Sequence, residues 1–547
     1  MSSHGYVQGD SPSPTPELTY CSFPSILIAS DKRGQGNPNF PRLLALAPDW
    51  RSEAGGKSDG TIDMLHDDAL LEIFDSYRKL VSCHNGMWKW QTLLHVCRRW
   101  RHLTLASPQC LNLRIACNPR TPTRKLLDIW PPFPISVSGF PWNWTDSRCK
   151  DNIIAALERH DRVFRIDLSD IPSAELGQIA STMEEPFPAL THLRVHPDRV
   201  KLEITTMWVT QVAALPLPNA FLGGSAPRLQ EFTLKGIPFP ALPNLVLSAT
   251  HFQKLHLLNV PHAGYISPRA MVTFLLALPN LKYLTIEFPS PESRPLQTSP
   301  LPLIRTVLPS LTNFRFHGAR EYLVDFIDQI DTPLLDRLYM TFSSDLVFDF
   351  RRLYKFLDRA DGFKPFIRAE LGLSPWQVMA FLESPTTFKM NIASEVSGWP
   401  LESMTRLCDQ PIPLLSQVEW LEIREDRWNG IEFQDERGWQ EIVDDPDWLE
   451  LLDRFVSVKS LYISDRLGPI LASVLDKVTG ARVTEVLPAL QNLFIEHLWL
   501  QKFVQNTITP FVSARQLYDH PIVVQCWERE VGVGTALEDD LLRFVHF

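Results

Sequence analysis

Ten short segments of the chain share one spacing of apolar residues, apolar-x-x-apolar-x-apolar. The last four residues of each segment alternate between apolar and polar, which is typical of a short strand with one buried face. Successive segments begin roughly 23 to 40 residues apart, except across one gap that holds two weaker matches, at 366–371 and 388–393. We therefore predict strands in the segments that begin at Val163, Leu190, Leu229, Phe252, Leu281, Leu311, Leu335, Val418, Val458 and Leu490.

A helical pattern precedes several of these strands, and a proline stands just before many of them. The clearest example is SPRAMVTFLLALPN, in which Ser267 can cap a helix, Pro268 suits its first turn and Pro279 ends it. Each repeating unit is thus predicted to run from a helix through a tight turn into a short strand.

One such unit cannot bury its apolar face alone, but stacked units can, and they form a solenoid with a parallel sheet. The predicted fold class is therefore α/β: a small helical module followed by an irregular, leucine-rich-repeat-like α/β solenoid with a parallel sheet. The alternative is a doubly wound α/β domain, which the many short and unevenly spaced strands disfavour. A length of 547 residues also suits an elongated array better than one compact core.

Two helical patterns precede the repeats. In LHDDALLEIFDSYRKL, apolar residues recur at helical spacing, and Asp67 or Asp68 can cap the helix or charge its first turn. CHNGMWKW interrupts the pattern and is predicted to be a loop. WQTLLHVCRRWRHLTL resumes it and is predicted to be one helix, which ends before Pro108. Its apolar face would carry Leu93, Val96, Cys97, Trp100 and Leu103, with the arginines elsewhere.

The segment from Leu65 to about Leu105 resembles the F-box, on the text LHDDALLEIFDSY and LLHVCRRWRHL. The following text, ASPQCLNLRIACNPRTPTRKLLDIWPPFPI, looks like the continuation found in basidiomycete fungal F-box proteins with degenerate leucine-rich repeats. Residues 1–60 lie outside the resemblance; they are rich in Ser, Pro, Gly and Asp, show no periodicity and are predicted to be mostly disordered. We therefore expect three parts: this segment, an F-box-like helical module over 61–108 and the repeat domain over 109–547.

In that family the F-box docks on a Skp-type adaptor, which links it to a cullin scaffold, and the repeat domain presents a protein substrate. The resemblance implies that adaptor-binding positions are held by Leu65, Leu70, Leu71, Ile73, Phe74, Leu94, Val96, Cys97 and Trp100. A module of roughly forty residues is near the lower limit for folding alone, so it gains by burying apolar side chains on a partner. For Val96, Cys97 and Trp100, packing inside the module and contact with the partner both stay open.

The sequence departs from the family pattern in three places. His66 stands where the family has a proline that fixes the entry to the first helix. An extra stretch, from Arg78 to about Gln91, separates the two helical segments. The repeats also lack the asparagine that often follows the strand of a leucine-rich repeat, so no regular asparagine ladder is expected; its place is taken by Asp198, Ile237, Val260 and Pro289.

Charge and composition narrow the functional classes. The net charge of −10 argues against a surface that binds nucleic acid as a whole. The eight cysteines include no C-x-x-C pair, which favours a reducing compartment. The chain begins without a signal-peptide pattern, and no apolar run reaches the ~18 residues of a membrane span. We therefore expect a cytoplasmic or nuclear protein that binds neither membrane nor nucleic acid.

No motif for catalysis or for a cofactor stands out. GGKS, at 55–58, lacks the first glycine and the preceding strand of a phosphate-binding loop. Cysteine and histidine gather near the module, but their spacing fits no known zinc site; the residues are Cys83, His84, His95, Cys97 and His102. No nucleophile-elbow or cysteine–histidine signature is present. We predict no enzymatic activity, no metal and no cofactor.

Two further regions could contact a partner. The segment from Arg424 to Arg454 is dense in acidic residues and holds Trp428, Trp439 and Trp448. It is either a solvated insertion between repeats or a loop that meets a basic substrate with tryptophan anchors. Polar strand positions could line the concave face of the solenoid, among them His192, Lys282, Arg315 and Arg337.

The leading hypothesis is a substrate-recognition subunit of a Skp–cullin–F-box ubiquitin ligase. The module would bind the adaptor, and the repeats would bind a protein substrate that the sequence does not identify. The alternative is a repeat scaffold with a vestigial F-box and no ligase role, for which His66 is the best sequence argument.

Overall fold

The computed structural model divides the chain into two compact units, Met1–Ala69 and Leu70–Phe547. The predicted disordered segment, the GGKS motif and most of the acidic segment lie outside the described residues. The structure describes residues 65–82, 89–107, 111, 113–139, 144, 147–197, 215–290, 292–295, 305–342, 350–363, 366–374, 377–383, 386–393, 415–425, 447–464, 466–496 and 502–527.

The second unit is an α/β structure built on one large sheet. The strands of that sheet are β1 (Ile115–Cys117), β2 (Ile135–Gly139), β3 (Val163–Ile171), β4 (His192–Pro197), β5 (Glu231–Lys235), β6 (Lys254–Leu258), β7 (Tyr283–Phe288), β9 (Asn313–Gly318), β11 (Arg337–Phe342), β12 (Arg368–Ser374), β13 (Gln377–Glu383), β14 (Thr387–Ala393), β15 (Trp420–Glu425), β16 (Ser460–Ile463), β17 (Asn492–Glu496) and β18 (Val523–Trp527). Their spatial order is β1-β2-β3-β4-β5-β6-β7-β9-β11-β14-β13-β12-β15-β16-β17-β18. Two short strands, β8 (Thr306–Val307) and β10 (Ile330–Asp331), pair separately.

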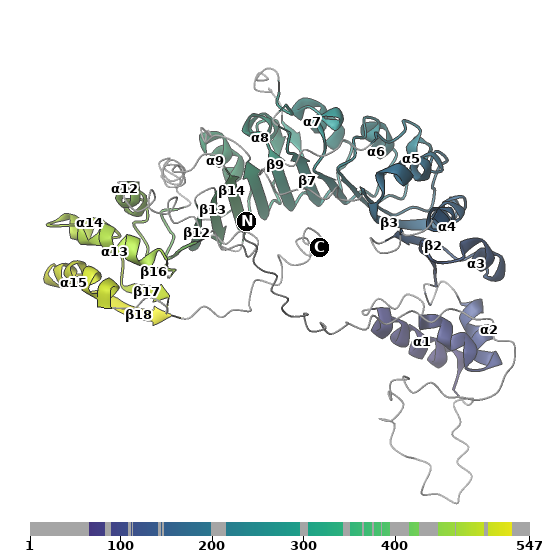
Figure 1. Cartoon of the computed structure of the whole chain (residues 1–547), viewed down its shortest axis with the longest axis horizontal. Coiled ribbons are helices and arrows are strands. Elements are labelled where there is room, and N and C mark those ends of the chain that lie inside the picture. The colour runs from purple at the N-terminus through teal and green to yellow at the C-terminus, as the bar shows by residue number, and fades with distance from the viewer. Residues whose placement is uncertain are drawn as a thin grey trace, which may run out of the picture. The chain divides into compact units, whose positions relative to one another are not determined.

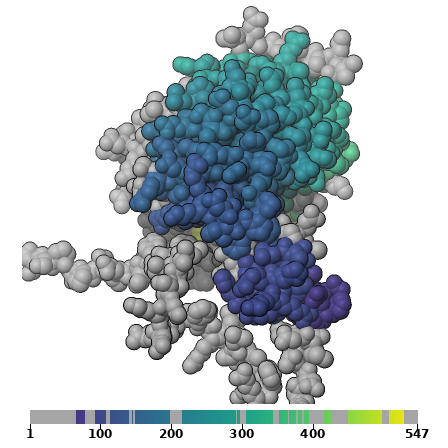
Figure 2. Space-filling view, turned by 90° about the vertical axis from the view of Figure 1, so that its right-hand side faces the viewer, coloured from purple at the N-terminus to yellow at the C-terminus, as the bar shows by residue number. Residues whose placement is uncertain are grey.

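Helices connect most neighbouring strands and lie on the outer side of the curved sheet, whose strands line the inner, concave side (Figure 1). These helices are α3 (Thr123–Ile129), α4 (Ser147–Leu157), α5 (Ser173–Ser181), α6 (Leu242–Leu247), α7 (Pro268–Leu275), α8 (Arg320–Ile327), α9 (Phe350–Asp358), α12 (Asp447–Asp453), α13 (Gly468–Asp476), α14 (Arg482–Glu485) and α15 (Lys502–Leu517). The doubly wound alternative is wrong, because strand order largely follows chain order and the helices share one face. Consecutive repeats pack side by side, as Figure 2 shows by their colours.

Each of the ten predicted segments contains a strand, and the two weaker matches overlap β12 and β14. The alternation of apolar and polar residues in the sequence corresponds to an alternation of burial in the structure, since half-buried and buried residues alternate along both β9 and β11. Ser267 caps α7 as expected: its side chain accepts the N–H of Ala270. The mostly parallel α/β solenoid-like architecture is therefore confirmed.

The prediction of an all-parallel sheet is wrong at one place. Strand β13 runs antiparallel to both β12 and β14. Only residues 375–376 separate β12 from β13, and only 384–385 separate β13 from β14. So short a connection can join antiparallel strands but cannot hold the crossover that parallel strands need.

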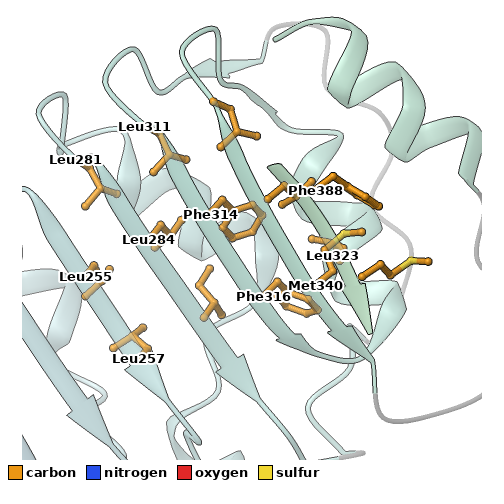
Figure 3. Packing of buried hydrophobic residues seen from close by; sticks show 14 of the residues in the cluster. Leu255, Leu257, Leu281, Leu284, Leu311, Phe314, Phe316, Leu323, Met340 and Phe388 are labelled. Carbon is orange, nitrogen blue, oxygen red and sulfur yellow. The ribbon is translucent and has the colours of Figure 1, made fainter. Parts of the chain in front are cut away.

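The core lies between the sheet and its helices as rows of apolar side chains in register. One row joins Leu255, Leu284, Phe314, Leu338 and Phe388 across five neighbouring strands. Figure 3 shows a second row, with Leu257, Phe316 and Met340, and Leu323 of α8 packed over it. At positions where leucine-rich repeats carry asparagine, Ile237 and Val260 are buried, so apolar packing occupies those sites.

Three arginines bind backbone carbonyl groups where one repeat passes into the next. Arg162 donates to the carbonyls of Pro131 and Phe133. Arg359 donates to those of Ile327 and Ile330 in the same way. Arg515 is fully buried, and its guanidinium donates to the carbonyls of Val483, Val486, Leu487, Pro488 and Leu490. Carbonyls left free at helix ends and turns thereby gain donors.

Among the described residues, no helix is long and apolar enough to cross a membrane.

Candidate functional site

Three helical pieces form the module that the sequence singled out: α1 (Asp67–Ser82), the 3₁₀ helix η3 (Lys89–His95) and α2 (Arg98–Ala106). At the start of α1, the Nδ1 atom of His66 lies 3.4 Å from the backbone N–H of Asp68, which donates to it. Asp67 and Asp68 occupy the first turn, where acidic side chains favour a helix. A histidine in the proline position thus still provides an acceptor for a backbone donor of the first turn.

The prediction of one continuous helix over 90–105 is wrong. The 3₁₀ helix ends at His95 and α2 begins only at Arg98, because Cys97 has an extended backbone with φ −155° and ψ 173°. The Sγ atom of Cys97 accepts the N–H of Trp100 at 3.4 Å and caps the new helix. Helix α1 also continues to Ser82, so the predicted extra stretch from Arg78 begins as helix; residues 83–88 lie outside the described part.

The module has its own apolar core. Leu70 and Phe74 of α1 are fully buried, Leu94 of η3 is 4% exposed, and all three belong to the predicted adaptor-binding set. The rings of Phe74 and Trp100 lie 4.7 Å apart, which joins α1 to α2. The hydroxyls of Tyr77 and Thr92 lie 3.1 Å apart and link α1 to η3. These contacts fix the three pieces against one another.

The remaining predicted adaptor residues are partly or largely accessible. Ile73 is 47% exposed, Val96 is 57% exposed, and Leu65, in the first unit, is 39% exposed. Leu71, Cys97 and Trp100 are half-buried. The structure therefore divides the predicted set into side chains that build the module and apolar side chains that it leaves in solvent.

The basic side of α2 is not only a solvated face. Arg98 and His102 are exposed as expected. The Nε atom of Arg101, however, donates to the carbonyl of Leu94 at 2.9 Å and ties α2 to η3. This role was not predicted from the sequence, because every residue has a backbone carbonyl group and the residue pattern does not show which of them will accept a hydrogen bond.

Comparison with known protein families finds none that matches the chain, and no curated protein matches it either. Within the described part of the chain, no group of three or more His, Cys, Asp or Glu side chains is placed to hold a metal ion.

The acidic segment is described only at its two ends, since residues 426–446, with Trp428 and Trp439, lie outside the described part. Trp448 of α12 is fully buried in the core. Its predicted role as a substrate anchor is wrong, because a side chain without exposed surface cannot meet a partner. At the first end of the segment, Glu425 pairs with Arg466 at 2.9 Å.

The concave face, which is the sheet face turned away from the helices, carries polar and charged side chains in rows. His192, Arg315 and Arg337 stand on it at half-buried strand positions, and exposed Lys282 directly precedes β7. Burial lowers the pKa of His192 and favours the neutral ring. Opposite His192 on β5, Glu231 pairs with Arg194 at 3.8 Å and with Lys254 at 3.6 Å. Three of the predicted candidates, His192, Arg315 and Arg337, therefore share one face, whereas Lys282 lies just before its strand.

An aromatic cluster at the C-terminal end of the same face was not predicted. The ring of Tyr462 lies 4.6 Å from that of Trp420, 4.3 Å from that of Phe494 and 5.3 Å from that of Trp527. Arg368 lies over Trp420, 3.8 Å from the ring centre. Because the rings cover one another, this cluster holds the last repeats together. The signal in the sequence was an aromatic residue at the outward strand position in VEWLEI, VKSLYI and LQNLFI.

Proposed function

We propose that the chain is the substrate-recognition subunit of a Skp–cullin–F-box ubiquitin ligase. The observation that carries the proposal is a small helical module, F-box-like in sequence, that leaves Ile73 and Val96 about half exposed to solvent. Large apolar side chains in solvent gain roughly 1 kcal/mol or more each when a partner buries them. A Skp-type adaptor is the partner that the sequence resemblance suggests, and cullin would follow through it.

The solenoid would then hold the substrate. The subunit needs no catalytic group for this role, because it raises the effective concentration of the substrate near a ubiquitin-loaded enzyme. The curved sheet offers a long, polar face for such binding, and repeat proteins use faces of this kind for extended partners.

Co-purification with a Skp-type adaptor tests the proposal. The wild-type full-length chain is expected to retain the adaptor, whereas Ile73→Asp and Val96→Asp should each weaken binding at least tenfold, because a carboxylate would be buried without a partner. The matched control is Ile129→Asp, since Ile129 is 72% exposed on α3, outside the module. It should bind as the wild type does.

Two results would contradict the proposal in different ways. A wild-type chain that does not bind any Skp-type adaptor leaves the alternative, a repeat scaffold with a vestigial F-box. Equal binding by Ile73→Asp, Val96→Asp and the wild type would keep the ligase role but remove these residues from the interface. Trp100 is unsuitable for this test, because its ring packs on Phe74 and its truncation would disturb the module itself.

A further inference from the structure

Three neighbouring strands, β9, β11 and β14, form a basic strip on the concave face. The outward residues in register are Arg315, Tyr339 and Lys389 in one row, and Asn313, Arg337 and Thr387 in the row before it. A third row holds His317, Thr341 and Asn391. All nine residues are half-buried, so each keeps some accessible surface.

The strip contains three cations and no carboxylate. No salt bridge joins Arg315 or Arg337 to any carboxylate of the described chain. The nearest acidic positions border the strip: Glu287 stands on β7 opposite His317, Glu383 on β13 opposite Thr387, and Asp336 just before Arg337. The strip therefore has an excess of positive charge at its centre.

Several cations elsewhere on the same face are paired. Besides the pairs that Glu231 makes on one side of the strip, Arg368 pairs with Glu422 at 3.8 Å on the other. Arg424 pairs with Glu370 as well. The charge of the strip also reaches its neighbours: burial is the main reason why the pKa of His256 falls to about 4, and Arg315 lowers it further. Arg315 and Arg337, by contrast, form no salt bridge with a carboxylate of the described residues.

We infer that the strip binds an acidic, extended segment of a partner protein, with Arg315 and Arg337 as its principal contacts. Guanidinium groups bind carboxylates through paired, charge-assisted hydrogen bonds. Neighbouring strands are about 4.8 Å apart and residues two positions apart on a strand are about 6.6 Å apart, so Arg315 and Arg337 are separated by roughly 8 Å, which an extended peptide covers in two to three residues. Acidic side chains two or three residues apart would fit the strip. If the chain is a ligase receptor, this segment belongs to the substrate, and that assignment rests on the proposed function.

A nucleic acid is a poorer fit for the same charge. Sequence-tolerant binding of a single strand needs a long basic groove with a series of stacking rings. The strip spans three strands and offers only two rings, those of Tyr339 and His317, while the whole chain carries a net charge of −10. A short acidic peptide matches both the length and the charge of the strip.

Fluorescence anisotropy with a labelled poly-glutamate peptide and the purified full-length chain tests this inference. The wild type should bind the peptide, and the affinity should fall with added salt. The double variant Arg315→Glu/Arg337→Glu should bind at least tenfold more weakly. The matched control is the double variant Arg165→Glu/Arg159→Glu, which makes the same change in net charge at exposed arginines outside the strip and should change the affinity less than twofold.

The inference is overturned if the wild type does not bind the peptide, if both double variants lose binding equally, or if single-stranded RNA binds more tightly than the peptide through the same arginines. Melting temperatures of the variants should match that of the wild type, since all four arginines keep solvent-accessible surface. Adaptor binding is measured on the same samples. Peptide binding without adaptor binding would refute the ligase role alone, and adaptor binding without peptide binding would refute the strip alone.

Discussion

Replacing Arg515 with methionine should loosen the C-terminal repeats of the solenoid. The two shortest bonds of its guanidinium, to the carbonyls of Val483 and Val486, are both 3.1 Å long. A net contribution of about 1.5 kcal/mol for each gives about 3 kcal/mol, and the longer bonds to Leu487, Pro488 and Leu490 add somewhat less. Methionine preserves much of the buried volume but donates no hydrogen bond, so we expect a loss of roughly 3–4 kcal/mol.

The loss should be local, because each repeat of a solenoid is stabilised mainly by its neighbours. Amide hydrogen exchange reports such local opening. Backbone amides of α14, α15 and the turn that leads into β17 should exchange roughly 100-fold faster in Arg515→Met, since 1.4 kcal/mol corresponds to a factor of about ten. Amides of β4 to β7, far along the sheet, should be unaffected.

Arg482→Met is the matched control for this prediction. Arg482 lies on α14 close to the same turn, but its side chain is 57% exposed and pairs with Asp453 at 3.5 Å. An exposed pair of this kind contributes less than about 1 kcal/mol. If both variants exchange at the wild-type rate, the carbonyl contacts of Arg515 do not stabilise this end of the solenoid and the reasoning is refuted.

Three further predictions follow from single sites. Cys97→Ser should keep the cap of α2, whereas Cys97→Ala should lower the free energy of unfolding of the module by about 0.5–1 kcal/mol. Equal melting temperatures of the two variants would exclude a capping role. His256 has its pKa lowered from 6.5 to about 4, so its contribution to folding is complete above pH 6.5 and is lost as the pH falls toward 4. Urea titrations should show up to about 3 kcal/mol of this pH dependence in the wild type and less in His256→Gln. Gly223→Ala should lower the melting temperature of the protein more than Gly224→Ala does. Both glycines have positive φ, but only at Gly223 would the new Cβ meet Pro186, at 2.6 Å. Similar melting temperatures of the two variants would contradict this.

Burial patterns explain how much of this fold could be predicted. The spacing that begins at Leu281 or Leu311 predicts a strand because every second side chain of the strand is buried in the core and must be apolar. This holds whether the neighbouring strand is parallel or antiparallel. Strand direction is not encoded in that alternation. Val378 and Leu382 of β13 are buried as the inward residues of a parallel strand are, and only the short connections on either side distinguish the two cases.

The candidate site was predictable in its composition but not in its geometry. Periodicity placed Val96 and Trp100 on one helical face, yet the apolar spacing runs unchanged through the break at Cys97, whose thiol caps the helix. Whether an apolar residue such as Phe74 or Ile73 faces the core or the solvent depends on the packing of all three helical pieces. The basic strip was missed as a unit because Arg315, Arg337 and Lys389 meet only through the register of strands far apart in the chain.

The reversed strand β13 bears on how strands can be added to or removed from this sheet. Each change of strand direction exchanges the face on which a right-handed crossover places its helix. The chain reverses on entering β13 and again on entering β14, so the repeats from β15 onward keep their helices on the same side as those before β12. Strands added or removed here in pairs therefore leave the direction of every later strand, and the side on which its helix lies, unchanged.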